Sequence, residues 1–408
     1  MAIRQTWRNA GEKCFSVIIG GDVCPREENS QFVAENAASI VKEMKGVFEK
    51  DAFKILQWEC AVTGGGEPIV KSGPNLRCTE NVLNLLSELS IDAALLANNH
   101  TGDYGPSEVL TTIDAIEKRG ILTVGAGRNF DDAAKPLIVE KNGVRMAILN
   151  FCENEFGGVR KDIPGTNCLD PFLNIEQIKA ARKQADVVIV TIHGGHEFYP
   201  YPSVRMVRTY RAFAEAGADA VWNCHTHCPC GFEVWQGKPI IYSPGNFYFP
   251  GRGGSVSSWW TGYVTKFLCD ENGVYGYELT PYGFCMEKMF PLAGEQLAQA
   301  ERYLLGIASV IGDFDRLQSL FESWCTGAGI GYMSVVNNTR SEDYPPDWSD
   351  PEVVRKWIPA RNLFNCESHA DLLRHTTRLY EEGRMAEAAA GLAEIQKLWE
   401  PEFVTWLD

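Results

Sequence analysis

The chain has 408 residues, and its 53 acidic side chains outnumber the 38 basic ones, which gives a formal net charge of −15. This balance argues against nucleic acid as a partner, because phosphate backbones are bound by lysine and arginine, whereas a small anionic substrate needs only one local positive site. A hydrophobic fraction of 45% predicts a large core, and the lack of any run of about 18 apolar residues argues against a transmembrane helix.

Cysteine content and the first residues of the chain bear on its compartment. The 13 cysteines form an odd, scattered set, which is typical of reduced thiols and not of a disulfide framework. The first residues lack the long apolar segment of a signal peptide. We therefore expect a cytoplasmic protein.

Short apolar runs alternate with amphipathic segments up to about residue 290, which predicts an α/β fold. The expected strands are Phe15–Ile19, Phe53–Trp58, Asp92–Ala97, Leu122–Ala126, Val144–Phe151, Asp186–Ile192, a run ending at Val221–Trp222, Val264–Leu268 and Tyr275–Thr280. The expected helices are Gln31–Glu49, a helix capped by Thr79 and ending at Leu89, Pro106–Arg119, Ile175–Gln184 and Val204–Ala216.

Helical patterns dominate the sequence from about Gly294 onward. We expect a first domain over residues 1–290 and a helical extension over residues 291–408 that packs on it. The expected helices of the extension are Leu297–Ile307, Phe314–Trp324, Ala370–Glu382 and Met385–Trp399, with a loop at Ser341–Pro351.

Polar side chains of metal-ligand type follow five of the predicted strands. They are Asp22, Glu59, Asn99 with His100, His193, and His225 with His227. In a sheet with helical crossovers the strand ends lie along one edge, so these side chains can converge. Leaving His100 aside, the two carboxylates, one amide and three histidines exceed the four ligands of a tetrahedral zinc. They suit two metal ions about 3.5–4 Å apart that share a carboxylate.

Five segments resemble the bacterial capsule-synthesis CapA family, which includes poly-γ-glutamate synthesis proteins and belongs to the calcineurin-like metallophosphoesterase superfamily. They are GGDVCP, WECAVT, LANNHTGDYG, IHGGHEFYPYP and NCHTHCPCGFEVWQGKPIIYSPGNFYF. The resemblance covers roughly Phe15 to Thr280. It implies a four-layer α/β/β/α sandwich, to which the helical C-terminal extension is added.

The resemblance also implies a role for each matching residue. Two divalent transition metals (manganese, iron or zinc) would be held by Asp22, Glu59, Asn99, His193, His225 and His227, with Glu59 as the bridging carboxylate. His100 would meet the leaving group or the oxyanion, and Asp103 would orient it. The chain departs from the superfamily pattern at Cys24, where a histidine is frequent, and at Cys224, where glycine is usual.

Six further residues are candidates for substrate binding. Lys71, Arg77 and Arg252 are loop cations that can pair with a carboxylate or phosphate. Glu153 and Glu155 follow a predicted strand end, and His196 lies just past the turn at His193. A structural zinc site built from Cys224, Cys228, Cys230 and a histidine is an alternative for this region, although the spacing fits such sites poorly.

The expected function is metal-assisted hydrolysis of a small anionic or polyglutamate-like substrate. The scissile bond is a phosphoester or a γ-glutamyl, peptide-like amide, and the residues do not choose between the two. The alternative is a metal- or polymer-binding accessory protein in capsule or poly-γ-glutamate synthesis that has no turnover.

Overall fold

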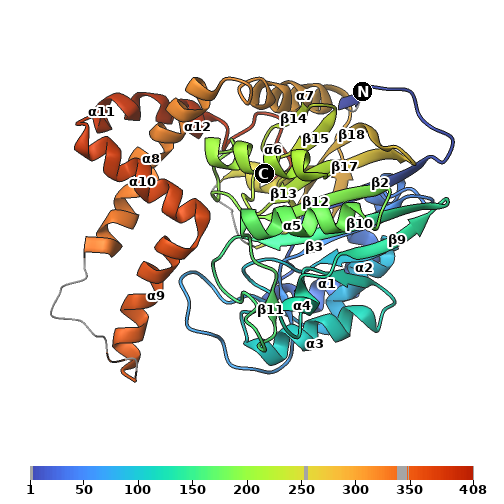
Figure 1. Cartoon of the computed structure of the whole chain (residues 1–408), viewed down its shortest axis with the longest axis horizontal. Helices are drawn as coiled ribbons and strands as arrows, with labels where there is room; N and C mark the ends of the chain where they lie inside the picture. Colours follow the sequence, from blue (N-terminus) through green and yellow to red (C-terminus); the bar gives the residue numbers. More distant parts are fainter. Residues whose placement is uncertain (1–2, 252–255, 338–346, 348, 408) are drawn as a thin grey trace.

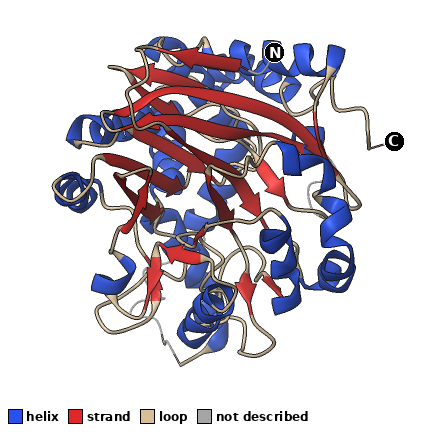
Figure 2. Ribbon diagram, turned by 90° about the vertical axis from the view of Figure 1, so that its right-hand side faces the viewer, coloured by secondary structure: helices blue, strands red, loops and turns tan. Residues whose placement is uncertain are grey.

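A computed structural model describes residues 3–251, 256–337, 347 and 349–407 of the chain. Within these residues, nine strands form one sheet and six form a second, and helices lie on the outer sides of the strands (Figure 1, Figure 2). This arrangement confirms the expected four-layer α/β/β/α sandwich. Arg252 and most of the expected loop at Ser341–Pro351 lie outside the described residues.

The larger sheet runs in the order β1-β18-β17-β2-β3-β6-β7, with β16 beside β2 and β19 beside β18. Strands β2, β3, β6 and β7 are mutually parallel, so their carboxyl ends share one edge. The bounds are β1 Ile3–Thr6, β2 Phe15–Val23, β3 Phe53–Trp58, β6 Ala93–Leu95, β7 Leu122–Val124, β16 Asn246–Tyr248, β17 Thr261–Asp270, β18 Gly273–Phe284 and β19 Met289–Pro291.

The smaller sheet runs in the order β14-β15-β13-β12-β10-β9, and its strands β10, β12, β13 and β15 are parallel. The bounds are β9 Leu137–Lys141, β10 Val144–Cys152, β12 Val187–His193, β13 Ala220–Cys224, β14 Phe232–Trp235 and β15 Lys238–Ile241. Two short pairs complete the strands: β4 Ala61–Val62 with β5 Arg77–Cys78, and β8 Ala126–Gly127 with β11 Gly165–Thr166.

Alternate residues of the central strands face different cores, because successive side chains of a strand point to opposite faces. Val17 and Ile19 of β2 pack between the two sheets, whereas Ile18 packs against the helices outside. Val187 and Ile189 of β12 join the same core between the sheets. Both faces are therefore buried, which explains why these strands read as continuous apolar runs.

Helices α1 to α4 accompany the larger sheet and its loops, and α5 and α6 cover the smaller sheet. The bounds are α1 Ser30–Ile40, α2 Asn84–Glu88, α3 Pro106–Glu117, α4 Phe130–Ala133, α5 Pro171–Arg182 and α6 Val204–Ala216. Thr79 lies at the N-cap position, as predicted, but of a 3₁₀ turn that leads into α2. Thr79 makes no side-chain capping bond, and a 3₁₀ turn at Glu80–Leu83 precedes α2.

The C-terminal extension is helical, as expected, and its orange to red helices lie beside the sandwich in Figure 1. Leu317 and Phe321 of this extension share a core with Tyr210 and Phe213 of α6. The expected single helix Met385–Trp399 is two shorter helices. The bounds are α7 Gly294–Ala308, α8 Phe314–Asn337, α9 Pro351–Asn365, α10 Glu367–Glu381, α11 Met385–Ala388 and α12 Leu392–Lys397. In the described part of the chain, no helix combines the length and the apolar character needed to cross a bilayer.

Candidate metal centre

The six predicted ligand residues come from the carboxyl ends of parallel strands in both sheets. Asp22 lies near the end of β2, Glu59 directly follows β3, and His193 is the last residue of β12. Asn99 lies in the loop after β6, and the two histidines His225 and His227 follow β13. The two sheets are stacked face to face, and these strand ends lie at the same edge of the stack. The structure therefore brings all six side chains together.

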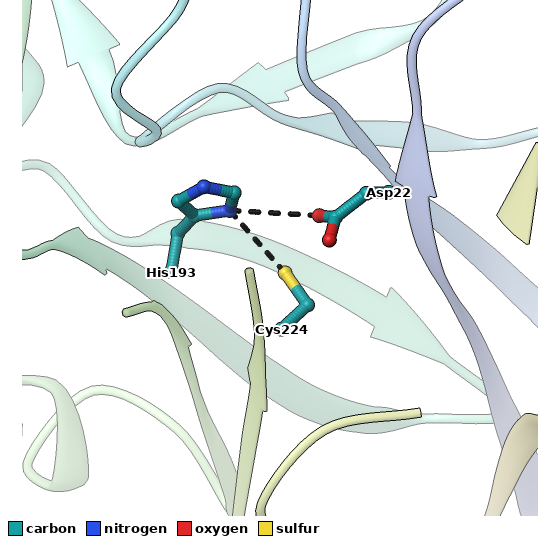
Figure 3. A group of neighbouring side chains, drawn as sticks. All are labelled: Asp22, His193 and Cys224. Carbon is teal, nitrogen blue, oxygen red and sulfur yellow. Dashed lines mark hydrogen bonds and ion pairs between the residues drawn. The ribbon is translucent and has the colours of Figure 1, made fainter. Parts of the chain in front are cut away.

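His193 lies at the middle of this cluster. Its Nε2 atom is 3.1 Å from Asn99 Oδ1, 3.0 Å from His225 Nδ1 and 3.4 Å from Glu59 Oε1. Its Nδ1 atom is 3.5 Å from Asp22 Oδ1 and 3.5 Å from the Cys224 thiol (Figure 3). One imidazole therefore faces an amide, a second imidazole, two carboxylates and a thiol.

His227 closes the cluster on the side of the larger sheet. Its Nδ1 is 3.7 Å from Asp22 Oδ2, and its Nε2 is 3.8 Å from Glu59 Oε1. The same oxygen, Glu59 Oε1, therefore lies between His193 and His227. Asn246 of β16 holds the His227 ring, with 2.8 Å between its Oδ1 and Nδ1 of the histidine.

The turn that carries His225 and His227 is strained. Both residues have positive φ angles, 111° for His225 and 54° for His227, in a region that non-glycine residues seldom adopt. The His225 backbone N–H donates to Asp22 Oδ2 at 3.1 Å, and the Thr226 hydroxyl donates to the Cys228 carbonyl at 2.9 Å. These bonds hold a conformation of the kind that clusters at functional sites.

The donor set fits divalent metal ions. Asp22 and Glu59 are fully buried, yet among the described residues Asp22 Oδ1 and both carboxylate oxygens of Glu59 accept no hydrogen bond, and His193 approaches Asp22 Oδ1 and Glu59 Oε1 only to 3.5 Å and 3.4 Å. Buried charges of this kind are costly unless they are paired or coordinate a metal. Two groups have ligand atoms within 4.8 Å of one another: Asp22, His193 and Cys224, and Glu59, His225 and His227.

The pKa shifts record the same excess of negative charge. Burial raises the pKa of Glu59, and the neighbouring Asp22 carboxylate adds to this. Burial alone lowers the pKa of His193, but Glu59 and Asp22 outweigh it and raise that pKa to about 10. Without a metal, the site therefore draws a proton onto His193, and a bound cation would take over that compensating charge.

His100 lies at the edge of the cluster and is oriented by a buried ion pair. Its Nδ1 is 2.7 Å from Asp103 Oδ2, and the other Asp103 oxygen accepts from Lys71 Nζ at 2.6 Å. Burial raises the pKa of Asp103, but His100 and Lys71 outweigh it and hold that pKa below its usual value. The Nε2 atom of His100 consequently faces the metal centre, 4.0 Å from Glu59 Oε1.

Comparison with known proteins identifies the family of the chain. Residues 16–251 match the family model described as bacterial capsule synthesis protein PGA_cap. The chain belongs to this family. The matched segment contains every predicted metal ligand, together with His100 and Asp103, and it ends before the C-terminal helices begin.

Curated relatives of this PGA_cap protein carry names that refer to PGA, capsule or polyglutamine synthesis. The PGA biosynthesis protein CapA of Bacillus subtilis (strain 168) is 31% identical over 232 residues, which are 55% of this chain and 59% of that protein. The capsule biosynthesis protein CapA of Bacillus anthracis is 34% identical over 181 residues, 43% and 44% of the two chains. A probable polyglutamine synthesis accessory protein of Mycobacterium tuberculosis (strain ATCC 25618 / H37Rv) is 28% identical over 218 residues, 50% and 57%. The chain thus spans about half the length of the curated relatives it matches.

Two solved structures from Thermus thermophilus are also similar. A hypothetical protein has 15% sequence identity and a TM-score of 0.42, covering 66% of this chain and all of its own. A 5'-nucleotidase precursor has 11% identity and a TM-score of 0.39, covering 73% of this chain and 59% of its own.

The weaker substrate candidates of this PGA_cap protein have separate positions. Glu155 is at the metal centre, with its Oε1 3.5 Å from His225 Nε2, and the buried His196 lines the same cavity. Lys71, expected as a loop cation, is a buried partner of Asp103. Arg77 pairs with Glu27 at the surface, 2.8 Å away. Glu153 is paired with Arg205 and faces the C-terminal helices.

Sequence reasoning missed two residues that shape the site. Asn98 accepts the backbone N–H groups of His100 and Thr101 and so fixes their turn. Asn246 holds His227, and its place in the recognisable GKPIIYSPGNF segment was a usable signal.

The cysteines around the histidine pair do not converge on one point. Cys224 faces His193, whereas the Cys230 thiol donates to the Tyr199 carbonyl at 3.4 Å. A zinc site shared by these cysteines therefore has no support in this geometry.

Proposed function

We propose that this PGA_cap-family protein is a metal-dependent hydrolase that acts in capsule or poly-γ-glutamate synthesis. The observation that carries the proposal is the division of labour between Glu59 and His100. Glu59 has two buried oxygens that need a cation, and His100 is held next to them by a carboxylate that is not part of the ligand set. A protein that only binds metal does not need a carboxylate, Asp103, that orients His100 beside the ligands.

The residues that would hold two divalent metals are Asp22, Glu59, Asn99, His193, His225 and His227. When bound, such metals supply Lewis-acid chemistry, which polarises a scissile phosphoester or amide bond and lowers the pKa of water.

The protein's own groups position and move a proton. Asp103, kept ionised by Lys71, accepts a hydrogen bond from Nδ1 of His100 and fixes the orientation of the ring. Protonated His100 can then give up a proton from Nε2 to a leaving oxygen or nitrogen, which is general acid catalysis. Asn98 keeps the backbone of His100 in place while this happens. Burial of these groups excludes water from the Asp103–Lys71 pair and strengthens it.

The test is turnover by the purified protein loaded with manganese, iron or zinc. Phosphomonoesters, phosphodiesters and γ-glutamyl peptides cover the two bond types, and the expected result is hydrolysis of one class that stops on chelation and returns with metal. Full metal content without turnover of any class would contradict the hydrolase proposal. That outcome would favour an accessory role, a term that appears in the name of the Mycobacterium tuberculosis relative.

A further inference from the structure

We infer that the chain has a further zinc site, separate from the two-metal centre, where the sandwich meets its C-terminal helices. Its ligands are the Glu155 carboxylate, the Cys366 thiol and the His369 imidazole. One ligand atom from each of these residues lies within 4.8 Å of the other two. The site goes beyond the proposed hydrolysis, and two of its three ligands lie outside the family-matched segment.

The three ligands come from two distant parts of the chain. Glu155 lies in the loop that follows β10, Cys366 separates α9 from α10, and His369 lies in the first turn of α10. Side chains three positions apart in a helical turn are neighbours, and a spacer of two residues between ligands is common in zinc sites. A bound ion would therefore tie the start of α10 to the end of β10.

The chemistry of the donors suits zinc. Thiolate, imidazole and carboxylate are its three usual protein ligands, and bonds of about 2.0–2.3 Å place tetrahedral ligand atoms roughly 3.3–3.8 Å apart. The three ligand atoms already lie within 4.8 Å of one another, so small side-chain rotations bring them to this separation. Three protein ligands leave the fourth position to water.

The Cys366 thiol can lose its proton without leaving its partner unsatisfied. Cys366 is 1% exposed, and its S–H donates to the Glu153 carboxylate at 3.4 Å. Glu153 also accepts from Arg205 at 2.7 Å, from the Ser368 hydroxyl at 2.9 Å and from the Ser368 backbone N–H at 3.2 Å. When zinc binds, a sulfur–zinc bond forms and the thiol proton passes to water, while Glu153 keeps three donors.

The carboxyl groups around the sulfur favour a cation. Glu153, Glu155 and Glu367 each place one carboxyl oxygen within 4.8 Å of the Cys366 sulfur. Arg205 pairs with Glu153, but within the described part of the chain no lysine or arginine forms an ion pair with Glu155 or Glu367. Buried charges are costly unless they are paired or coordinate a metal, so a divalent ion would supply the compensating charge.

A cavity gives an ion access to this site. It has a volume of about 220 Å³, and Glu155 lines it together with Asn362 and His369, which form a wall of the cavity from the extension. Nδ1 of His369 lies 3.2 Å from the Asn362 side-chain amide, and the Tyr332 ring packs edge-on at 5.2 Å. The imidazole is thus held through one ring nitrogen, as zinc-binding histidines commonly are.

Cobalt(II) in place of zinc tests the thiolate ligand directly, because a cobalt–thiolate bond gives a strong charge-transfer absorption in the near ultraviolet. The full chain is stripped of metal with a chelator and reloaded with cobalt. The absorption is expected in wild type, lost in Cys366→Ser and retained in Cys224→Ser, which replaces the cysteine beside His193. An absorption that is absent from wild type, or that persists in Cys366→Ser, would overturn the inference.

Counting metal ions gives a second measurement, which holds even if Cys366→Ser fails to fold. His369→Gln keeps every cysteine and is expected to bind one zinc ion fewer per chain, as measured by plasma mass spectrometry. His375→Gln, at a half-buried histidine of the same helix, is expected to match wild type. Unchanged zinc content in folded His369→Gln would overturn the inference. A cobalt–thiolate absorption that depends on Cys366 in a protein without turnover would uphold the site while contradicting the hydrolase proposal.

Discussion

His100 and Asp22 lie within the same buried cluster, but their contacts indicate different roles. Asp22 has an oxygen without a donor among the described residues, whereas His100 is already engaged with Asp103 through Nδ1. We expect His100→Asn to keep metal content nearly unchanged and to lower kcat by roughly 10²–10⁴, the usual contribution of a general acid. Asp22→Ala is expected to lose metal and activity together. Metal analysis and turnover on the same preparations separate the two, and wild-type turnover in His100→Asn would exclude it as the acid.

The paired histidines are expected to hold the metals. Because His193 Nε2 and His225 Nδ1 lie 3.0 Å apart, replacing both by alanine removes two imidazoles that face one point. His193→Ala combined with His225→Ala is expected to release at least one ion per chain, as measured by plasma mass spectrometry on folded protein. His375→Ala, at a half-buried histidine of α10, is the control. Full metal content in the double variant would show that these histidines are not the ligands.

Helix α10 is attached to the sandwich by buried charged groups, and their pairing contributes to the free energy of unfolding. Arg205 compensates the negative charge of Glu153. Burial alone would raise the pKa of Glu153, but Arg205 and Ser368 outweigh it and lower that pKa to about 2. Arg205→Met leaves that carboxylate buried and unpaired, and we expect it to lower the free energy of unfolding by about 3–5 kcal/mol at neutral pH. Arg208→Met, on the exposed side of the same helix, is expected to cost at most about 1 kcal/mol. Urea denaturation of both variants measures the difference, and equal losses would contradict it.

The first turn of α10 makes stability depend on pH through Glu367. Burial and the Glu153 carboxylate raise the pKa of Glu367 to about 7, against about 4.3 in an unfolded chain. Between these values the folded protein holds a proton that the unfolded chain has lost, so this contribution to stability falls as pH rises and is gone above about pH 7.

Glu367→Gln cannot ionise, and it is expected to be more stable than wild type above pH 7, on the order of 1–3 kcal/mol, with the difference shrinking toward pH 4.5. Unfolding free energies at matched pH values provide the measurement, with Glu381→Gln at the exposed end of the same helix as the control. A difference that grows toward low pH would have the wrong sign for this mechanism.

For the whole molecule, the sequence predicted the layers and the edge at which the ligands meet. Apolar runs such as those of β3 and β12 are local signals, and the polar residues that follow them need only parallel strands to converge. The burial of Lys71 could not be predicted, because it depends on Asp103 coming to the same place through a distant loop. The contact of Asn362 with the cavity depends likewise on how the extension packs, which no local pattern encodes.

The expected division of the chain at residue 290 also remains a prediction, and the shared core bears on it. Leu317 and Phe321 cover Tyr210 and Phe213, so a fragment ending at residue 293 would expose a large apolar surface on α6. We expect that fragment to bind a hydrophobic dye and to aggregate, whereas the full chain stays monodisperse in light scattering. A monomeric fragment with cooperative unfolding would instead establish residues 1–290 as an independent domain.

The wall that α9 and α10 contribute to the cavity has a consequence for how such a protein can diversify. The six ligands proposed for the metal centre and His100 lie within residues 16–251, whereas Asn362 and His369, which line the adjoining cavity from the extension, lie outside that stretch. Changes in the extension can therefore alter which molecule is accepted while every reacting group stays where it is. Exchanging the helices between relatives would then transfer substrate preference without rebuilding the catalyst.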